Sequence, residues 1–198
     1  WKIINKQYVD RLGKTREVKV GVIGFTPPAI TEWDKRWLDG KVIVDGVKTS
    51  AEKFIPELRK AGAEVVVVLA HGGISTETYR DNMENPVYYL AGVPGIDAIV
   101  TGHSHTYFPA DTAGGTKYTA ADVDNTKGLI KGVPVVQAGF WGSDLGLIKL
   151  KLNRGTDGKW AVDKTQSVAS VRHIYDKANM KSLVAADPKV TELVGPLH

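Results

Sequence analysis

Cysteine is absent from the sequence, which excludes disulfides, iron–sulfur clusters, thiolate zinc sites and a thiol nucleophile. Long apolar runs are absent too, and the longest, Val65–Ala70, is far below the roughly 18 residues that a membrane-spanning helix needs. Charge of one sign is not concentrated: the net charge is only +4, and Lys14, Arg16 and Lys19 are interrupted by Glu17. Such a surface does not predict a nucleic-acid polymer as a partner.

The remaining composition is that of a folded, soluble protein. The chain has 198 residues, of which 42% are hydrophobic and 24% charged, proportions that exclude disorder and fit about one domain. The sequence starts at Trp1 rather than Met and carries no signal-peptide core. We therefore expect Trp1 to be a cut end, either a matured terminus or a boundary inside a longer polypeptide.

Hydrophobic patterning predicts an α/β chain, with strands and helices in alternation and then a run of strands. The segments with strand patterns are Val18–Phe25, Glu64–Ala70, Asp97–Thr101, Pro134–Ala138, Leu145–Leu152, Trp160–Ser170 and Val171–Tyr175. Helices are predicted over Ser50–Ala61, with its first residue as N-cap, and over Thr76–Leu90. Tyr107–Gly132 is rich in loop residues, and the tail from Asp176 is predicted to be helical. We expect a sheet that is parallel at first and antiparallel later.

Three histidines fall where two predicted strands end. His71 directly follows Glu64–Ala70, and His103 and His105 follow Asp97–Thr101, all near glycines. Sites of open α/β sheets form beyond the carboxyl ends of the strands, and consecutive parallel strands usually lie side by side, about 4.8 Å apart. Imidazoles gathered at such an edge are typical ligands of divalent metals, and His-x-His spacing suits two neighbouring ions. The alternative is that each histidine only hydrogen-bonds to the backbone at its strand end.

Two further histidines and two aromatic residues lie outside this group of three histidines. His173 lies within a predicted strand and His198 at the chain end, so neither is assigned a metal role. Tyr107 and Phe108 directly follow the His-x-His motif, and aromatic faces stack nucleobases. These two are candidates for substrate binding, with packing inside the protein as the alternative.

At this point the motifs resemble those of a known family. Gly102-His103-Ser104-His105 after an apolar strand, preceded by Ala70-His71, is similar to the last two metal motifs of calcineurin-like metallophosphoesterases. Other stretches resemble the bacterial 2′,3′-cyclic-nucleotide 2′-phosphodiesterase/3′-nucleotidases of the 5′-nucleotidase group. These stretches are Val20–Pro28, Trp33–Lys35, Gly132–Pro134, Gly139–Gly142, Leu145–Gly146 and Ile174–Asp176. The resemblance extends over nearly all of the chain.

The resemblance implies a layered metallophosphoesterase sandwich of mixed sheets flanked by helices. This chain would be its C-terminal portion, with a sheet-and-helix core over 1–175 and a helical tail over 176–198. The resemblance also implies two divalent metal ions, such as Zn, Mn or Fe, with His71 and His103 on the second ion and His105 on the first. It further implies hydrolysis of nucleotide or cyclic-nucleotide phosphoesters, and a periplasmic or cell-surface location.

Two motifs that the family supplies from its N-terminal half are absent: an Asp-x-His pair, and an Asn-His pair whose His protonates the leaving group. Asp97 begins its strand, at the wrong end for the site, and neither Asp144 nor Asn85 is assigned as a ligand. We expect the missing half of the domain to be the partner of this chain and to carry the general acid, so that the chain alone is inactive. Two alternatives stay open: a non-catalytic half-domain that binds metal or nucleotide, and a 5′-nucleotidase or nucleotide-sugar hydrolase.

Overall fold

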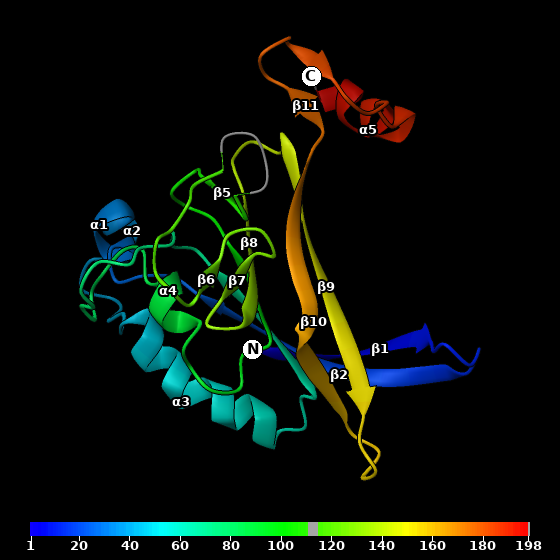
Figure 1. Cartoon of the computed structure of the whole chain (residues 1–198). Coiled ribbons are helices and arrows are strands. Elements are labelled where there is room, and N and C mark those ends of the chain that lie inside the picture. The colour runs from blue at the N-terminus through cyan, green and yellow to red at the C-terminus, as the bar shows by residue number, and fades with distance from the viewer. Residues whose placement is uncertain (111–114, 198) are drawn as a thin grey trace.

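The computed structural model describes residues 1–110 and 115–197, and its largest element is an eight-stranded mixed sheet (Figure 1). The strand order is β1-β2-β3-β4-β8-β7-β6, and β5 also pairs with β8. These strands are β1 (Lys2–Val9), β2 (Thr15–Phe25), β3 (Val65–Ala70), β4 (Ala98–Thr101), β5 (Tyr107–Phe108), β6 (Val123–Asp124), β7 (Leu129–Ile130) and β8 (Val133–Ala138). Strands β2, β3, β4 and β8 run parallel, with antiparallel strands at both sides. The predicted α/β class with a parallel centre is confirmed.

Helix α3 (Val47–Lys60) covers one face of this sheet. Its Ala51, Ile55 and Leu58 are fully buried, and their spacing gives the helix one continuous apolar face. The helix begins one turn earlier than predicted, because Gly46 rather than Ser50 is its N-cap. The other helices are short: α1 (Ile30–Trp33), α2 (Lys35–Leu38), α4 (Val87–Leu90) and α5 (Pro188–Val194). None of the helices among the described residues is long and apolar enough to cross a membrane.

A two-stranded antiparallel ribbon packs on the opposite face, against β8. It consists of β9 (Asp144–Arg154) and β10 (Trp160–His173), which merges the two strands predicted after Trp160 into one. Gly146 of β9 lies so close to Val136 of β8 that an added Cβ would come within 2.9 Å of the valine side chain. Figure 1 shows the ribbon running across the sheet, with α3 on the opposite side of the main strands from the ribbon.

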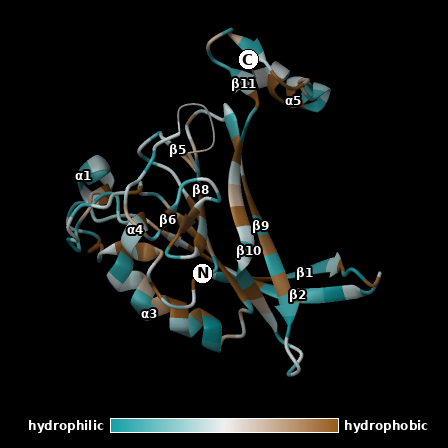
Figure 2. Ribbon diagram, in the orientation of Figure 1, coloured by the Kyte–Doolittle hydropathy of each residue, from teal (hydrophilic) through white to brown (hydrophobic). Residues whose placement is uncertain are grey.

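The two faces of the sheet are covered to different extents. Residues in register across neighbouring strands point to the same face. The row under α3 is buried in the core and consists of Ile23, Val68, Ile99 and Val135. The next row, on the ribbon face, consists of Gly24, Leu69, Val100 and Val136. The ribbon buries Val136, whereas Leu69 is 46% and Val100 41% exposed. Figure 2 shows hydrophobic residues recurring along the main strands and α3.

The predicted helix over Thr76–Leu90 is wrong for most of its length. Only α4 is helical, while residues 76–86 form turns and bends, with a bridge between Ile74 and Pro86. A residue before proline is disfavoured in the helical region, so Asn85-Pro86 delays the helix. Asp81 instead accepts a hydrogen bond from the Thr49 side chain, which fastens this segment to the start of α3, and another from Tyr79 within the segment.

The tail from residue 176 is only partly helical, which corrects a second prediction. Strands β11 (Tyr175–Asp176) and β12 (Lys181–Ser182) form a small hairpin before α5. Asp176 accepts hydrogen bonds from the backbone of Ala178 and Asn179, which makes a turn where the helix was expected. Figure 1 shows the hairpin and α5 beyond one end of the ribbon, away from the main sheet.

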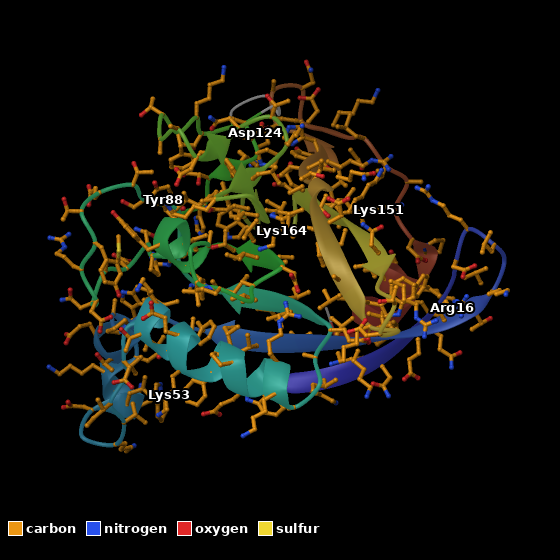
Figure 3. All side chains as sticks on the ribbon, turned by 60° about the horizontal axis from the view of Figure 1, so that its bottom comes forward. Arg16, Lys53, Tyr88, Asp124, Lys151 and Lys164 are labelled. Atoms are coloured by element: carbon orange, nitrogen blue, oxygen red, sulfur yellow. The ribbon has the colours of Figure 1, made fainter. Side chains whose placement is uncertain are left out.

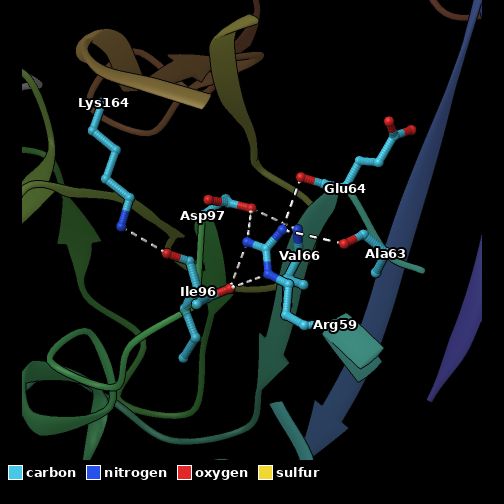
Figure 4. A network of polar contacts seen from close by, with 8 residues as sticks. Arg59, Ala63, Glu64, Val66, Ile96, Asp97 and Lys164 are labelled. Atoms are coloured by element: carbon cyan, nitrogen blue, oxygen red, sulfur yellow. Dashed lines mark hydrogen bonds and ion pairs between the residues drawn. The ribbon is translucent and has the colours of Figure 1, made fainter. Parts of the chain in front are cut away.

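At the amino ends of the parallel strands a polar network joins helix, sheet and ribbon (Figure 4). The Arg59 guanidinium lies 2.5 Å from the Asp97 carboxylate and donates hydrogen bonds to the carbonyls of Gly95, Ala63 and Glu64. Lys164 of β10 donates a hydrogen bond to the Ile96 carbonyl. In Figure 3, Lys164 lies near the centre of the view and Lys53 near the edge. Asp97 therefore stabilises the fold at the amino ends of the strands, opposite the histidines, as its position in the sequence indicated.

Candidate functional site

The carboxyl ends of β3 and β4 bring two of the predicted histidines together. Ala70 and Thr101 are register partners, so the residues that follow them leave the sheet side by side. The ring centroids of His71 and His103 are 5.1 Å apart, with an angle of 63° between the ring planes. The Thr101 hydroxyl donates a hydrogen bond to the Gly72 carbonyl, which ties the two loops to each other. A shallow hollow of about 540 Å³ lies beside His71 over the ends of β2, β3 and β4.

The His103 ring is held on two sides. Its Nε2 lies 2.5 Å from Oε1 of Glu84, a hydrogen bond across 19 positions of sequence. The indole of Trp33 stacks on it with centroids 4.6 Å apart and planes 24° apart. Trp33 also meets the His71 ring edge-on at 6.2 Å. Glu84 and Trp33 thus fix the orientation of an imidazole that would otherwise rotate about its own bonds.

His105 takes a different position from the other two. Its ring stacks on Phe140, with centroids 4.9 Å apart and planes 21° apart. Across residues 1–110 and 115–197, the structure assembles no group of three or more His, Asp or Glu side chains fit to hold a metal ion. The structure thus brings the His71 and His103 rings together, and the roles of His71, His103 and His105 as metal ligands all stay predictions.

The donors at this edge suit a divalent transition metal in type but not in number. Neutral imidazole is a ligand for Zn, Mn and Fe, and His71 and His103 offer two imidazoles, whereas Glu84 is hydrogen-bonded to His103. A catalytic zinc site, for comparison, takes three protein ligands and keeps one position open. Further ligands would have to come from side chains that are not gathered here.

Phe108 does not take part in the site, which corrects one prediction. Its side chain is fully buried, belongs to the hydrophobic core and meets Tyr118 edge-on at 5.8 Å. A ring with no exposed face cannot stack a base. Tyr107, the preceding residue, points the other way because side chains alternate along a strand, and it is partly exposed.

Tyr107 lies in a pocket of about 480 Å³ that the sequence did not reveal. His173 and Asp144 line it too, and Nδ1 of His173 is hydrogen-bonded to the Asp144 carboxylate. Lys177 donates a 2.6 Å hydrogen bond to the Tyr107 hydroxyl. Asp144 and His173 lie opposite each other on the two strands of the ribbon. Only the pairing of β9 with β10 reveals that they are neighbours.

His198 lies outside the described residues.

The Asp144 carboxylate is held in its charged form. Its side chain is only 1% exposed, and burial alone would raise its pKa. Hydrogen bonds from Ser143, His173 and Tyr107 outweigh that effect and leave the pKa of Asp144 below its ordinary value. Asp144 is thus a negative charge in the lining of the pocket, and it orients the His173 ring.

Comparison with solved structures identifies the class. The crystal structure of calcineurin-like phosphoesterase YfkN from Bacillus subtilis superposes on the chain with a TM-score of 0.87 at 38% identity. The match covers 100% of this chain and 56% of that one. The sheet and its helix layer are therefore those of a calcineurin-like phosphoesterase, and the chain belongs to that family.

Curated relatives narrow the class further. The chain is 45% identical over 190 residues to the 2′,3′-cyclic-nucleotide 2′-phosphodiesterase/3′-nucleotidase of Salmonella typhimurium, and 43% identical over 196 residues to the protein of the same name from Haemophilus influenzae. These alignments cover 96% and 99% of this chain. The chain spans only 28% and 29% of the length of those relatives. No family model matches the sequence.

Proposed function

We propose that the protein to which this chain belongs hydrolyses nucleotide phosphoesters, as a 2′,3′-cyclic-nucleotide 2′-phosphodiesterase and 3′-nucleotidase. The observation that carries the proposal is the pair of imidazoles, His71 and His103, 5.1 Å apart at the carboxyl edge of two parallel strands. The relatives that match nearly all of the chain are named for this activity. An exported location, in the periplasm or at the cell surface, is part of the same proposal.

In this proposal each residue of the edge has a stated task. His71 and His103 would hold one divalent ion, and His105 would hold a second. Such a pair of ions, when bound, activates water and neutralises charge on the phosphoryl group. Glu84 and Trp33 keep the His103 ring in one orientation, as outer partners of metal-binding histidines do. Tyr107 remains the aromatic candidate for contact with a nucleobase.

The proposal assigns this chain only part of the site. The Asp-x-His and Asn-His motifs that complete the family's site do not occur in the sequence. The carboxylate ligands and the histidine that protonates the leaving group would come from the remaining part of the domain. Chain 1–198 alone should therefore hydrolyse 2′,3′-cyclic AMP no faster than metal-containing buffer.

The experiment compares the chain with the longer protein that contains it. His103→Ala in the longer protein should lower kcat/KM for 2′,3′-cyclic AMP by more than the about 10–100-fold typical of outer-shell changes. Lys53→Ala, exposed on α3, is the control and should leave turnover unchanged. Full activity of His103→Ala would contradict the assigned metal role. Turnover by chain 1–198 that His103→Ala abolishes would contradict the incomplete site.

A second candidate is a non-catalytic half-domain that binds a metal ion or a nucleotide. The observation that favours it is that the described part of the chain gathers no three potential ligands at one point. The sequence of the source polypeptide separates the two candidates. An upstream segment with Asp-x-His and Asn-His supports the enzyme, and a true start near Trp1 supports the binding module. A panel of 2′,3′-cyclic, 3′- and 5′-nucleotides and a nucleotide sugar separates the phosphodiesterase from a 5′-nucleotidase or nucleotide-sugar hydrolase.

A further inference from the structure

The loop that carries His103 and His105 has a backbone that does not persist without support. Both histidines lie in the left-handed region, with φ of 71° and 56°. Residues with a Cβ adopt this region at an energetic cost, so the surroundings must determine the conformation. Within the loop only one short backbone hydrogen bond is formed, from Ser104 N to the Gly102 carbonyl at 2.9 Å. The support must therefore come from outside the loop.

Gln137 supplies the support of the backbone from the neighbouring strand, whereas Glu84, Trp33 and Phe140 contact the histidine rings. It is fully buried on β8, in register with Thr101, the last residue of β4 before the loop. Its Nε2 donates hydrogen bonds to the hydroxyls of Ser104 at 2.7 Å and Thr106 at 2.9 Å. Ser104 and Thr106 are the residues on either side of His105, and Ser104 separates it from His103. One buried amide group therefore holds both residues that flank His105.

The other end of the same amide has no compensating contact. Gln137 Oε1 is buried and has no hydrogen-bond partner among the described residues. A buried acceptor without a partner destabilises the folded state, so an apolar side chain of the same size would suit the core better. An apolar residue would therefore stabilise the core at least as well as this amide. What the amide adds is the two hydrogen bonds to the loop.

We propose that Gln137 is a positioning residue, which fixes the left-handed loop and through it the directions of His103 and His105. The metal-binding role of the loop rests on the proposed function, whereas the contacts of Gln137 with the loop do not depend on it. Gln137→Met keeps the length of the side chain and removes both donors. Outer-shell partners of metal-binding histidines typically contribute about 10–100-fold in metal affinity, and Gln137 should act in this range.

Two measurements on chain 1–198 test the proposal. Amide hydrogen exchange reports the loop itself through two hydrogen-bonded amides: Ser104 N, which donates to the Gly102 carbonyl, and Gly139 N, which donates to the Thr106 carbonyl. Gln137→Met should accelerate exchange of these two amides by about tenfold or more. Titration with Ni²⁺ reports the use of the loop, and the same variant should bind it about 10–100-fold more weakly than the wild-type chain. Thr106→Val removes one acceptor hydroxyl with little change in volume and should accelerate exchange in the same residues. It decides the question if Gln137→Met does not fold.

The matched control is Ser167→Ala. Ser167 is also fully buried and also makes two hydrogen bonds, with Lys151 N and the Asp163 carbonyl, but within the ribbon. Ser167→Ala should leave the amide exchange of the loop unchanged. Equal acceleration in Ser167→Ala and Gln137→Met, or none in Gln137→Met, overturns the proposal. If the wild-type chain binds no Ni²⁺, the result agrees with the incomplete site of the proposed function, and hydrogen exchange alone decides the role of Gln137.

Discussion

Asp144 is a single residue whose hydrogen bonds make the stability of the protein depend on pH. Its pKa in the folded protein lies below the ordinary value of about 3.9 because hydrogen bonds to the charged form outweigh burial. A carboxyl with a depressed folded pKa stabilises the protein fully above that ordinary value. The contribution is lost as the pH falls through the folded pKa, because the unfolded chain then binds the proton more readily.

Asp144→Asn should therefore destabilise the chain at neutral pH and matter less in acid. We expect a loss of about 1–3 kcal/mol in the free energy of unfolding at about pH 7, since hydrogen bonds to a charged group are removed. The difference from the wild type should shrink below about pH 4, as measured by urea unfolding across the acid range. Asp39→Asn, an exposed control, should stay within about 0.5 kcal/mol throughout. A difference that grows in acid would contradict the assigned direction of the pKa.

At the same scale, the sequence predicted part of the site. The position of His71 and His103 followed from strand ends, which apolar patterning locates well. The different orientation of His105 could not be predicted, because it depends on the left-handed backbone and on Phe140, thirty-five positions away. Burial of Phe108 was missed for a related reason: two adjacent residues of a strand face opposite sides, and the sequence alone does not say which side is covered.

Packing between elements depends on one glycine of β2. A Cβ added at Gly21 would lie 2.8 Å from the Ala63 Cβ and 2.9 Å from Leu58 of α3. Gly21→Ala should therefore push α3 from the sheet and lower the free energy of unfolding by about 1–3 kcal/mol, as overpacking does. Gly24→Ala on the same strand is the matched control, because its nearest neighbour would be 3.9 Å away. Thermal unfolding of both variants tests this, and equal midpoints would refute the packing argument.

At the scale of elements, the sequence predicted best where a segment is apolar without interruption. The central strands β3, β4 and β8 are buried on one or both faces, and their residue types leave few alternatives. Strand β1 was missed because half of the residues of Lys2–Val9 are polar and the segment lies at the sheet edge, where pairing with β2 rather than burial makes it a strand. The helix predicted over Thr76–Leu90 failed because contacts of Asp81 with α3, distant in sequence, override local spacing.

The molecule as a whole leaves part of its main sheet uncovered. Leu69 and Val100 are adjacent in register and more than 40% exposed, although parallel sheets are normally covered on both faces. Chain 1–198 should therefore bind an apolar dye such as ANS and associate with itself. The double change Leu69→Lys and Val100→Lys should lower both ANS fluorescence and the apparent mass in sedimentation. Leu12→Lys, at an exposed turn, is the control, and an equal effect there would refute this face as the source.

The main sheet has the Arg59–Asp97 network at the amino ends of its strands and the imidazoles at the carboxyl ends. The six residues of β3 separate the two ends by about 20 Å. Substitutions that far apart, with no shared neighbour, have additive effects. A stabilised variant can therefore be selected at the first end and combined with redesigned chemistry at the second, without repeating either search.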